Sequence, residues 1–213
     1  MNESMTEDQW LASTEPENML ALIRGNARSR LLRLLRFIFG STFHVSDRKL
    51  LLFGQAFCKR LAKAIETTSS CQTQVANVRN GALDIAEWAV KEAEKKSTDE
   101  VAMRIQFAVQ QSFSHLRATA VPLEPLKRIS ADLLRDIFGN PFDIVRMPKS
   151  VRAAKVVTLA RAIFDQESFH SMPRLADALE EAGCRNEVIL EHCRQLSEHV
   201  RGCWVLDLIL EYR

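Results

Sequence analysis

The sequence predicts an all-α protein, an irregular helical bundle of about eight to ten helices. Apolar residues recur every three or four positions along most of the chain, which is the period of an α-helix. The alternation of apolar and polar residues that marks a β-strand is nearly absent. The 213 residues include only seven glycines and six prolines, so the chain offers few turns for connecting short strands.

The first predicted helix begins near Thr14. Thr14 and Glu17 have the spacing of a capping box, and Pro16 suits the first helical position. A second helix is predicted over residues 27–39, with leucines on one face and arginines on the other. Together these two segments predict an amphipathic, strongly helical start to the chain.

Three further helices are predicted between residues 46 and 116. Ser46 is placed to cap the first of them, and its apolar stripe consists of Leu50, Phe53, Phe57, Leu61 and Ile65. A polar loop over 67–73 and a helix over 74–96 follow. Ser97 and Glu100 then form a second capping box. It opens a helix that carries Val101, Ile105, Ala108, Ser112 and Leu116 in register.

The C-terminal part is predicted as five helices. Pro122 and Pro125 precede a helix that ends at Phe138, where Gly139-Asn140-Pro141 stops it. The others are expected over 150–165, over 173–183, over a short stretch capped by Asn186, and over 197–210. We expect one domain over 1–213, with a weak seam at 139–148 between an N-terminal bundle (1–138) and a C-terminal helical subdomain (149–213).

Composition indicates a cytoplasmic protein. A chain of this length buries roughly 70% of its unfolded surface, so its fold needs neither a disulfide nor a metal. No stretch reaches the ~18 apolar residues of a membrane span, and the acidic start, 1–17, is unlike a signal peptide. Five irregularly spaced cysteines suit reduced thiols. We expect no membrane span, no peripheral membrane contact and no cofactor.

The positive charge is concentrated in residues 24–63. The net charge is only +2, yet this block holds ten basic residues and one acid. The basic residues are Arg24, Arg28, Arg30, Arg33, Arg36, Arg48, Lys49, Lys59, Arg60 and Lys63. Such a row could bind nucleic-acid phosphates, and the leucine face could lie on an anionic membrane. The plainer interpretation packs the leucines into the bundle and leaves the arginines solvated or paired with the acidic start.

Four segments carry a family resemblance. They are Thr6–Leu22, Ser46-Asp47-Arg48-Lys49-Leu50 with Cys58-Lys59-Arg60, Leu134-Arg135-Asp136-Ile137-Phe138-Gly139-Asn140-Pro141-Phe142, and the run from Leu175 that ends in His199-Val200-Arg201-Gly202-Cys203-Trp204. These strings resemble a family of uncharacterised bacterial helical proteins. The resemblance implies a shared helical fold and no assigned activity. Family members pass almost directly from the first helix to the Ser46 motif, so residues 25–45 are an insertion here.

Cysteines and histidines near the C-terminus suggest a metal site. Thiolate and imidazole suit Zn²⁺, and the ligand set would be Cys184, His192 (or Cys193), His199 and Cys203. On the predicted last helix, His199 and Cys203 would lie one turn apart. However, no close Cys-x₂₋₄-Cys pair is present. The competing interpretation is that the thiols are buried as small apolar groups and the histidines bond helix ends.

Catalytic signatures are weak. A nucleophilic cysteine needs exposure and a low pKa, and neither Cys193 near a helix C-terminus nor Cys203 within a helix offers these. Glu167 and His170 give half of a di-iron motif with no second copy, and the acids at 132 and 136 suggest a solvated stripe. Phosphate-binding loops and hydrolase motifs are missing from the sequence.

We therefore predict a non-catalytic protein-interaction module, a subunit or accessory component of a bacterial complex, with a protein partner. The alternative is a nucleic-acid-binding protein that uses residues 24–63. An enzyme built on the Cys/His cluster, metal-dependent or thiol-based, is the third interpretation. No catalytic residue and no metal ligand is assigned under the first interpretation.

Overall fold

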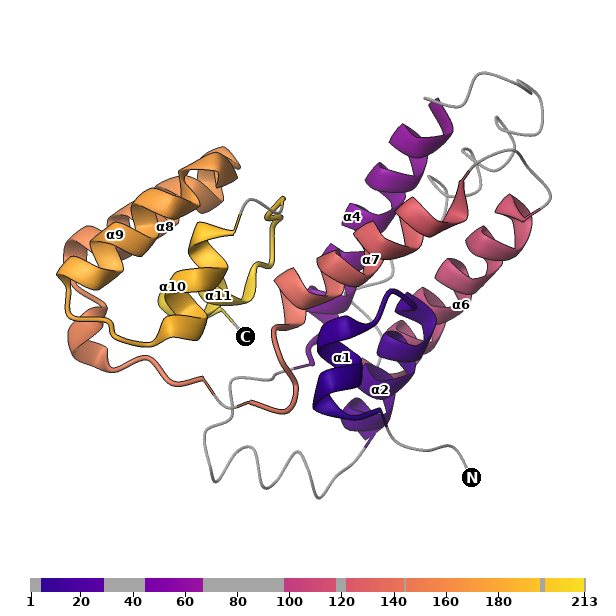
Figure 1. Cartoon of the computed structure of the whole chain (residues 1–213), viewed down its shortest axis with the longest axis horizontal. Coiled ribbons are helices and arrows are strands. Elements are labelled where there is room, and N and C mark those ends of the chain that lie inside the picture. Colours follow the sequence, from indigo (N-terminus) through magenta and orange to yellow (C-terminus); the bar gives the residue numbers. More distant parts are fainter. Residues whose placement is uncertain are drawn as a thin grey trace.

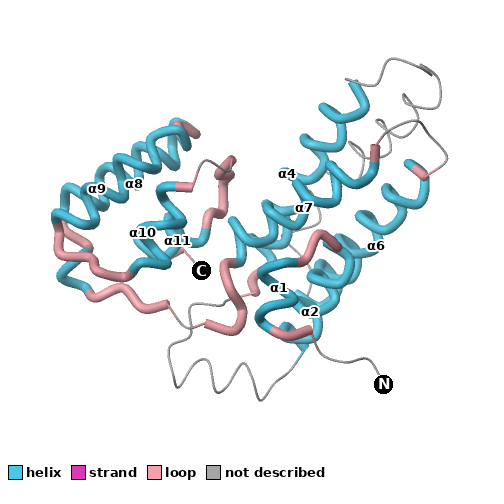
Figure 2. The backbone as a smooth tube through the Cα atoms, in the orientation of Figure 1, coloured by secondary structure: helices cyan, strands magenta, loops and turns pink. Residues whose placement is uncertain are grey.

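The computed structural model describes residues 5–28, 45–66, 98–117, 122–143, 145–195 and 198–212. Every regular element within these ranges is helical, which confirms the all-α class (Figure 2). The α-helices are α1 Glu7–Ala12, α2 Pro16–Arg28, α4 Asp47–Glu66, α6 Thr98–Leu116, α7 Leu123–Phe138, α8 Ala154–Gln166, α9 Met172–Glu181, α10 Glu187–Arg194 and α11 Trp204–Leu210. Two short 3₁₀ helices, η2 Lys149–Val151 and η3 Phe169–Ser171, flank α8.

The described helices form two groups (Figure 1). Helices α1, α2, α4, α6 and α7 enclose the first hydrophobic core, in which α2 and α4 both pack on α6 and α7. Its centre is aromatic: Trp10, Phe53, Phe57 and Phe113 are buried. The rings of Phe57 and Phe113 meet edge to face, with their centroids 5.8 Å apart. This group is called the N-terminal core below.

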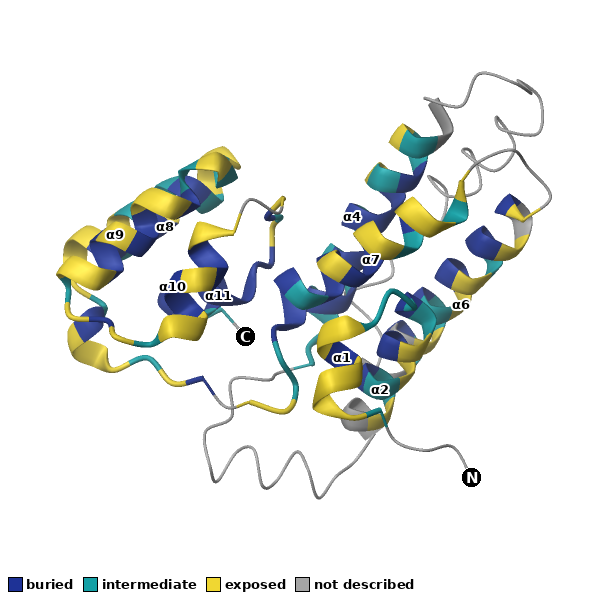
Figure 3. Cartoon of the chain, viewed as in Figure 1, coloured by how far each residue is buried: buried dark blue, intermediate teal, exposed yellow. Residues whose placement is uncertain are grey.

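Helices α8 to α11 enclose the second group, called the C-terminal core. Its buried residues are mostly aliphatic, among them Val156, Leu175, Ile189 and Leu206. Figure 3 shows the buried faces of α8, α9, α10 and α11 turned toward one another. The N-terminal core ends in sequence at Phe138 and the C-terminal core begins at Val145. A division into subdomains at 139–148 stays a prediction.

Several helix ends lie where the sequence predicts them. The Ser46 hydroxyl accepts a hydrogen bond from the Lys49 N–H (3.3 Å) at the start of α4. The Asn186 side chain accepts one from the Ile189 N–H (3.1 Å) at the start of α10. Helix α7 ends at Phe138, and Gly139 takes a positive φ of 68°. These positions follow from local capping chemistry.

Other ends differ from the prediction. Helix α1 was not predicted, although Thr6 and Gln9 form a complete capping box. Helix α7 begins before Pro125, and α8 begins at Ala154 rather than at 150. The last helix begins only at Trp204, because Gly202 has φ of +94° and breaks helical geometry. The helices predicted over 27–39 and 74–96 lie largely or wholly outside the described residues.

Candidate metal centre

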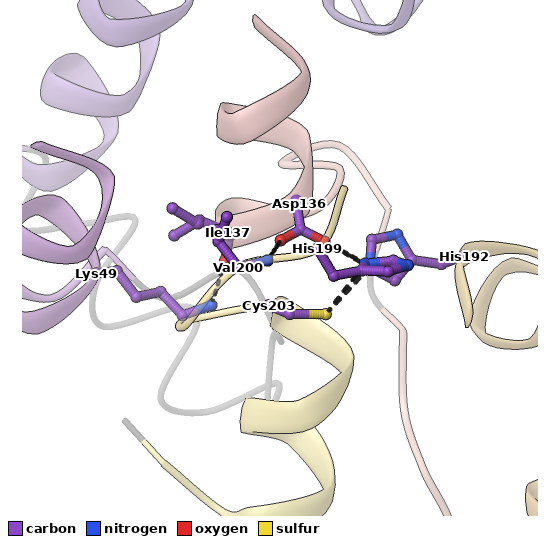
Figure 4. Close-up of polar contacts among 7 residues, drawn as sticks. All are labelled: Lys49, Asp136, Ile137, His192, His199, Val200 and Cys203. Atoms are coloured by element: carbon purple, nitrogen blue, oxygen red, sulfur yellow. Dashed lines mark hydrogen bonds and ion pairs between the residues drawn. The ribbon is translucent and has the colours of Figure 1, made fainter. Parts of the chain in front are cut away.

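Four buried side chains from both cores converge on one point (Figure 4). Asp136 comes from the last turn of α7, His192 from α10, His199 from the segment before α11, and Cys203 from the N-cap of α11. Each offers one nitrogen, oxygen or sulfur atom, and these four atoms all lie within 4.8 Å of one another. Within the described part of the chain, this is the group of His, Cys, Asp and Glu side chains that could hold a metal ion.

The individual distances are short. Asp136 Oδ1 lies 2.6 Å from His199 Nδ1 and 3.2 Å from His192 Nε2. Cys203 Sγ lies 3.2 Å from His192 Nε2 and 3.9 Å from His199 Nδ1. The second oxygen of Asp136 accepts a hydrogen bond from the Val200 N–H at 2.9 Å. That bond fixes both the carboxylate and the segment that carries His199.

A tight turn places His199 and Cys203 on the same side. The Cys203 N–H donates to the Val200 carbonyl at 3.0 Å, and Gly202 supplies the positive φ that this turn needs. A Cβ at position 202 would lie 3.0 Å from the Leu52 side chain. The position therefore requires glycine both for its backbone angle and for the close approach of α4.

The Asp136 carboxylate is held ionised. Burial alone would raise its pKa, but hydrogen bonds from His192 and His199, together with their charges, outweigh burial and lower the pKa to about 2. The carboxylate is thus an anion inside the protein, with three donors directed at it. A buried anion of this kind needs cationic compensation.

The Cys203 thiol has the opposite property. Burial raises its pKa well above the usual value, and the negative charge of Asp136 raises it further. The backbone N–H groups of Leu206 and Val205 oppose this shift without cancelling it. A thiol with such a pKa keeps its proton at neutral pH, so it is unsuited to act as a nucleophile.

The geometry is not that of a proton relay. In a catalytic triad the nucleophile and the acid bond opposite nitrogens of one imidazole. Here Asp136 and Cys203 approach the same nitrogen of His192, and both also approach Nδ1 of His199. Donors that converge on one point are typical of a coordination site. The Nε2 atom of His199 is buried without a hydrogen-bond partner.

The four donor atoms fit tetrahedral zinc. Zn–N and Zn–O bonds of about 2.0–2.2 Å and Zn–S bonds of about 2.3 Å separate neighbouring ligand atoms by roughly 3.3–3.6 Å. Four of the ligand-atom distances span 2.6 to 3.9 Å, and every pair lies within 4.8 Å. Small side-chain shifts would therefore bring all four atoms to bonding distance of one ion. Asp, His, His and Cys are all donors that zinc accepts.

A buried lysine stands beside the cluster. Lys49 of α4 donates to the Ile137 carbonyl at 2.8 Å, and its Nζ lies 3.8 Å from Asp207. Arg48 bonds the same Asp207 carboxylate at 2.8 Å. Burial lowers the pKa of Lys49 and the charge of Arg48 adds to the shift, although the negative charges of Asp207 and Asp136 oppose it. Through Ile137, Lys49 holds the turn of α7 that carries Asp136.

The structure brings together three of the four residues in the sequence-based ligand set, and metal binding by them stays a prediction. His192, His199 and Cys203 meet as that set requires, although residues 198–203 form a turn rather than a helix. Cys184 is buried but lies outside the cluster. Its place is taken by Asp136, which was predicted to belong to a solvated stripe. The stripe is wrong at that position: Asp136 is 6% exposed, whereas Asp132 is exposed on the same helix.

Two other predicted features lie away from the cluster. Glu167 is exposed and pairs with Arg201 at 2.9 Å, and His170 is exposed as well. Cys193 is buried, and burial with the nearby Cys184 raises its pKa to about 12. Cys193 therefore behaves as the buried apolar group that the sequence suggested.

Much of the described part of the basic block is bonded within the chain. Arg24 donates to Gln106, Arg48 pairs with Asp207, Arg60 pairs with Glu198, and Lys49 is buried. Lys59 and Lys63 are exposed on α4. The structure does not describe Arg30, Arg33 and Arg36, and it describes only the backbone of Arg28. A nucleic-acid or partner surface over 24–63 stays a prediction.

No family model, curated protein or solved structure matches the chain. The resemblance to a bacterial helical family therefore stays a prediction. None of the described helices is long and apolar enough to cross a membrane.

Proposed function

We propose that the chain binds one divalent transition-metal ion, zinc by its donor set, in a closed structural site made by Asp136, His192, His199 and Cys203. The observation that carries this proposal is the convergence of four buried ligand atoms within 4.8 Å. Metal binding requires that His192 Nε2 and His199 Nδ1 release the protons that bond Asp136, so the ion would replace these hydrogen bonds.

The donor chemistry favours zinc over other ions. Two imidazoles and one thiolate are borderline-to-soft ligands, which suit Zn²⁺ and disfavour Mg²⁺ and Ca²⁺. With Asp136 and Cys203 both anionic, a divalent ion makes the centre electrically neutral. Coordination would also remove the proton from Cys203, because a metal-bound thiol is deprotonated outright.

The site supports a structural role rather than catalysis. Four protein ligands complete a tetrahedron, whereas catalytic zinc keeps one position for water or substrate. All four side chains are buried, so a substrate has no direct access to the ion. This role agrees with the expectation of a non-catalytic protein.

Metal analysis of the purified protein tests the proposal. We expect close to one equivalent of zinc, and Co²⁺ substitution should give the intense visible bands of a tetrahedral site with a sulfur–cobalt charge-transfer band. Cys203→Ser should abolish the charge-transfer band. Cys184→Ser is the matched control, because this buried cysteine lies outside the cluster, and it should bind as the wild type does.

Two results would contradict the proposal. One is less than a tenth of an equivalent of metal after purification and after incubation with zinc. The other is loss of the charge-transfer band in the Cys184 variant with retention in the Cys203 variant. In either case Asp136 and its histidines would form a hydrogen-bonded network only.

We also propose that the protein acts through a protein partner, as its sequence led us to expect. Phe107 and Met103 favour this proposal: they lie one turn apart on α6 and are 60% and 44% exposed. Cross-linking to a co-purifying protein should be lost in a Phe107→Glu/Met103→Glu variant and kept in a Gln110→Glu control, which alters the exposed residue next along α6. Equal cross-linking by both variants would remove α6 from the interface.

A further inference from the structure

The four ligands of the proposed centre are divided between the two cores. Asp136 stands on α7, where its neighbours Leu134 and Ile137 belong to the N-terminal core. His192 and Cys203 stand among residues of the C-terminal core, and His199 precedes Cys203 by four positions. Asp136 therefore comes from the N-terminal core, and the other three ligands come from the later segment 192–203, which leads into and out of the C-terminal core (Figure 4).

The other described contacts between the cores are mainly polar. Arg60 pairs with Glu198, whose side chain is 67% exposed, and such an exposed pair contributes little to stability. Arg48 and the buried Lys49 of α4 both pair with Asp207 of α11, whose side chain is 3% exposed, so a charged cluster also crosses the boundary. In contrast, the helices within each core meet through buried aromatic or aliphatic side chains.

Apolar contact across the boundary is concentrated at the centre itself. Val200 packs against the N-terminal core, and Trp204 lies against Gly139, where an added Cβ would be 3.2 Å from the indole. Both residues adjoin ligands in sequence, and the His192 ring lies 5.1 Å from that of Trp204. The packing of this boundary thus depends on the position of the ligand-bearing turn.

From this division, and resting on the metal site proposed above, we infer that the ion cross-links the two cores. Metal binding and docking of the C-terminal core on α7 are then one coupled equilibrium. Without the ion, residues 198–204 and the last turn of α7 separate while both cores remain folded. The occupancy of the centre thereby controls whether the boundary between the cores is closed.

The experiment is hydrogen exchange read by mass spectrometry on the full-length chain, with zinc and after chelation. We expect chelation to accelerate exchange about tenfold or more at Val200, whose N–H bonds Asp136, and at Gly139. Amides within α4 and α9 should keep their protection. Helix content by circular dichroism should change little.

The sharpest variant is Asp136→Asn, because it removes the single ligand from the N-terminal core. His192, His199 and Cys203 remain, so Co²⁺ should still give a sulfur–cobalt charge-transfer band, with affinity reduced roughly 100-fold. At saturating metal the Val200 amide should nevertheless exchange as fast as in the chelated wild type. Asp132→Asn, one turn earlier on the exposed side of α7, is the matched control and should behave as the wild type.

The outcomes separate this inference from the metal site itself. If the wild type binds no metal, the proposed function fails and the inference fails with it. If metal binds but chelation leaves exchange at Val200 and Gly139 unchanged, the inference alone is overturned. Loss of protection throughout α4 and α9 would also overturn it, since the ion would then hold the whole fold.

Discussion

The two cores are stabilised differently. The N-terminal core buries large rings, with Phe53, Phe57 and Phe113 stacked or edge to face along α4 and α6. The C-terminal core buries smaller aliphatic side chains and three cysteines, and its helices α10 and α11 have only eight and seven residues. Helices that short are marginal without tertiary support. Three of the four proposed ligands, His192, His199 and Cys203, lie in or next to these two short helices.

The aromatic core is the place where one substitution should cost most. Phe57→Ala would remove a buried ring that touches both Phe53 and Phe113, and we expect a loss of about 3–5 kcal/mol in the free energy of unfolding. Metal affinity should stay within threefold of wild type at temperatures where the variant is folded. Urea unfolding and Co²⁺ titration measure the two quantities. A large change in metal affinity with a small change in the free energy of unfolding would contradict the view that Phe57 stabilises the N-terminal core independently of the metal site.

The C-terminal core should instead respond to the metal ion proposed for it. With free zinc at 100 times the dissociation constant, binding contributes about 2.7 kcal/mol, and Cys203→Ser should lose most of it. Cys184→Ser should keep the zinc-dependent increase in melting temperature, since Cys184 is buried but lies outside the proposed ligand group. Thermal scans with and without zinc check both variants. An equal loss in the two variants would mean that packing, not coordination, stabilises this core.

Local features of the fold could be predicted from the sequence. The contacts between the two cores could not. Capping residues such as Ser46 and Asn186 act on their own helices, so their effect is visible in a short window. Asp136 differs because its partners are 56 and 63 positions away, and only tertiary structure brings them together. Its nearest sequence signal was its place one turn after the buried Leu133.

The turn before α11 was missed for a related reason. Residues 197–210 contain enough apolar positions to suggest a continuous helix, and one glycine gives a weak signal. Gly202 ends the regular pattern because it adopts φ of +94° against Leu52 of the other core. The same reasoning explains why Cys184 looked equivalent to Cys203 in sequence. Sequence spacing alone could not show which of the two cysteines joins the histidines.

Lys49 sharpens the comparison at the boundary. Lys49→Met keeps the side-chain length but leaves the Ile137 carbonyl without its hydrogen-bond donor. Removal of the buried charge partly offsets that loss. We therefore expect the free energy of unfolding to fall by about 1 kcal/mol at pH 7. Because burial lowers the pKa of Lys49 below 10.5, the folded protein binds fewer protons than the unfolded chain in that window. Wild-type stability should therefore rise relative to the variant as pH increases toward 10.5. Chemical unfolding at several alkaline pH values measures this difference, and parallel curves would show that burial does not affect the lysine.

Lys127 provides the opposite case within the N-terminal core. Its ammonium lies 3.0 Å from both carboxylate oxygens of Glu15, and this hydrogen bond raises its pKa above 10.5. Glu15 is 43% exposed, so Lys127→Met should cost only about 0.5 kcal/mol at pH 7. A raised pKa means that the stabilisation is present below 10.5 and is lost as pH rises through the folded value. The stability difference between the wild type and Lys127→Met should thus fall at high pH. The stability difference between the wild type and Lys49→Met should rise as the pH approaches 10.5. The same series of unfolding measurements at alkaline pH tests both expected changes. If the two stability differences changed with pH in the same direction, burial would not distinguish Lys49 at the boundary from Lys127.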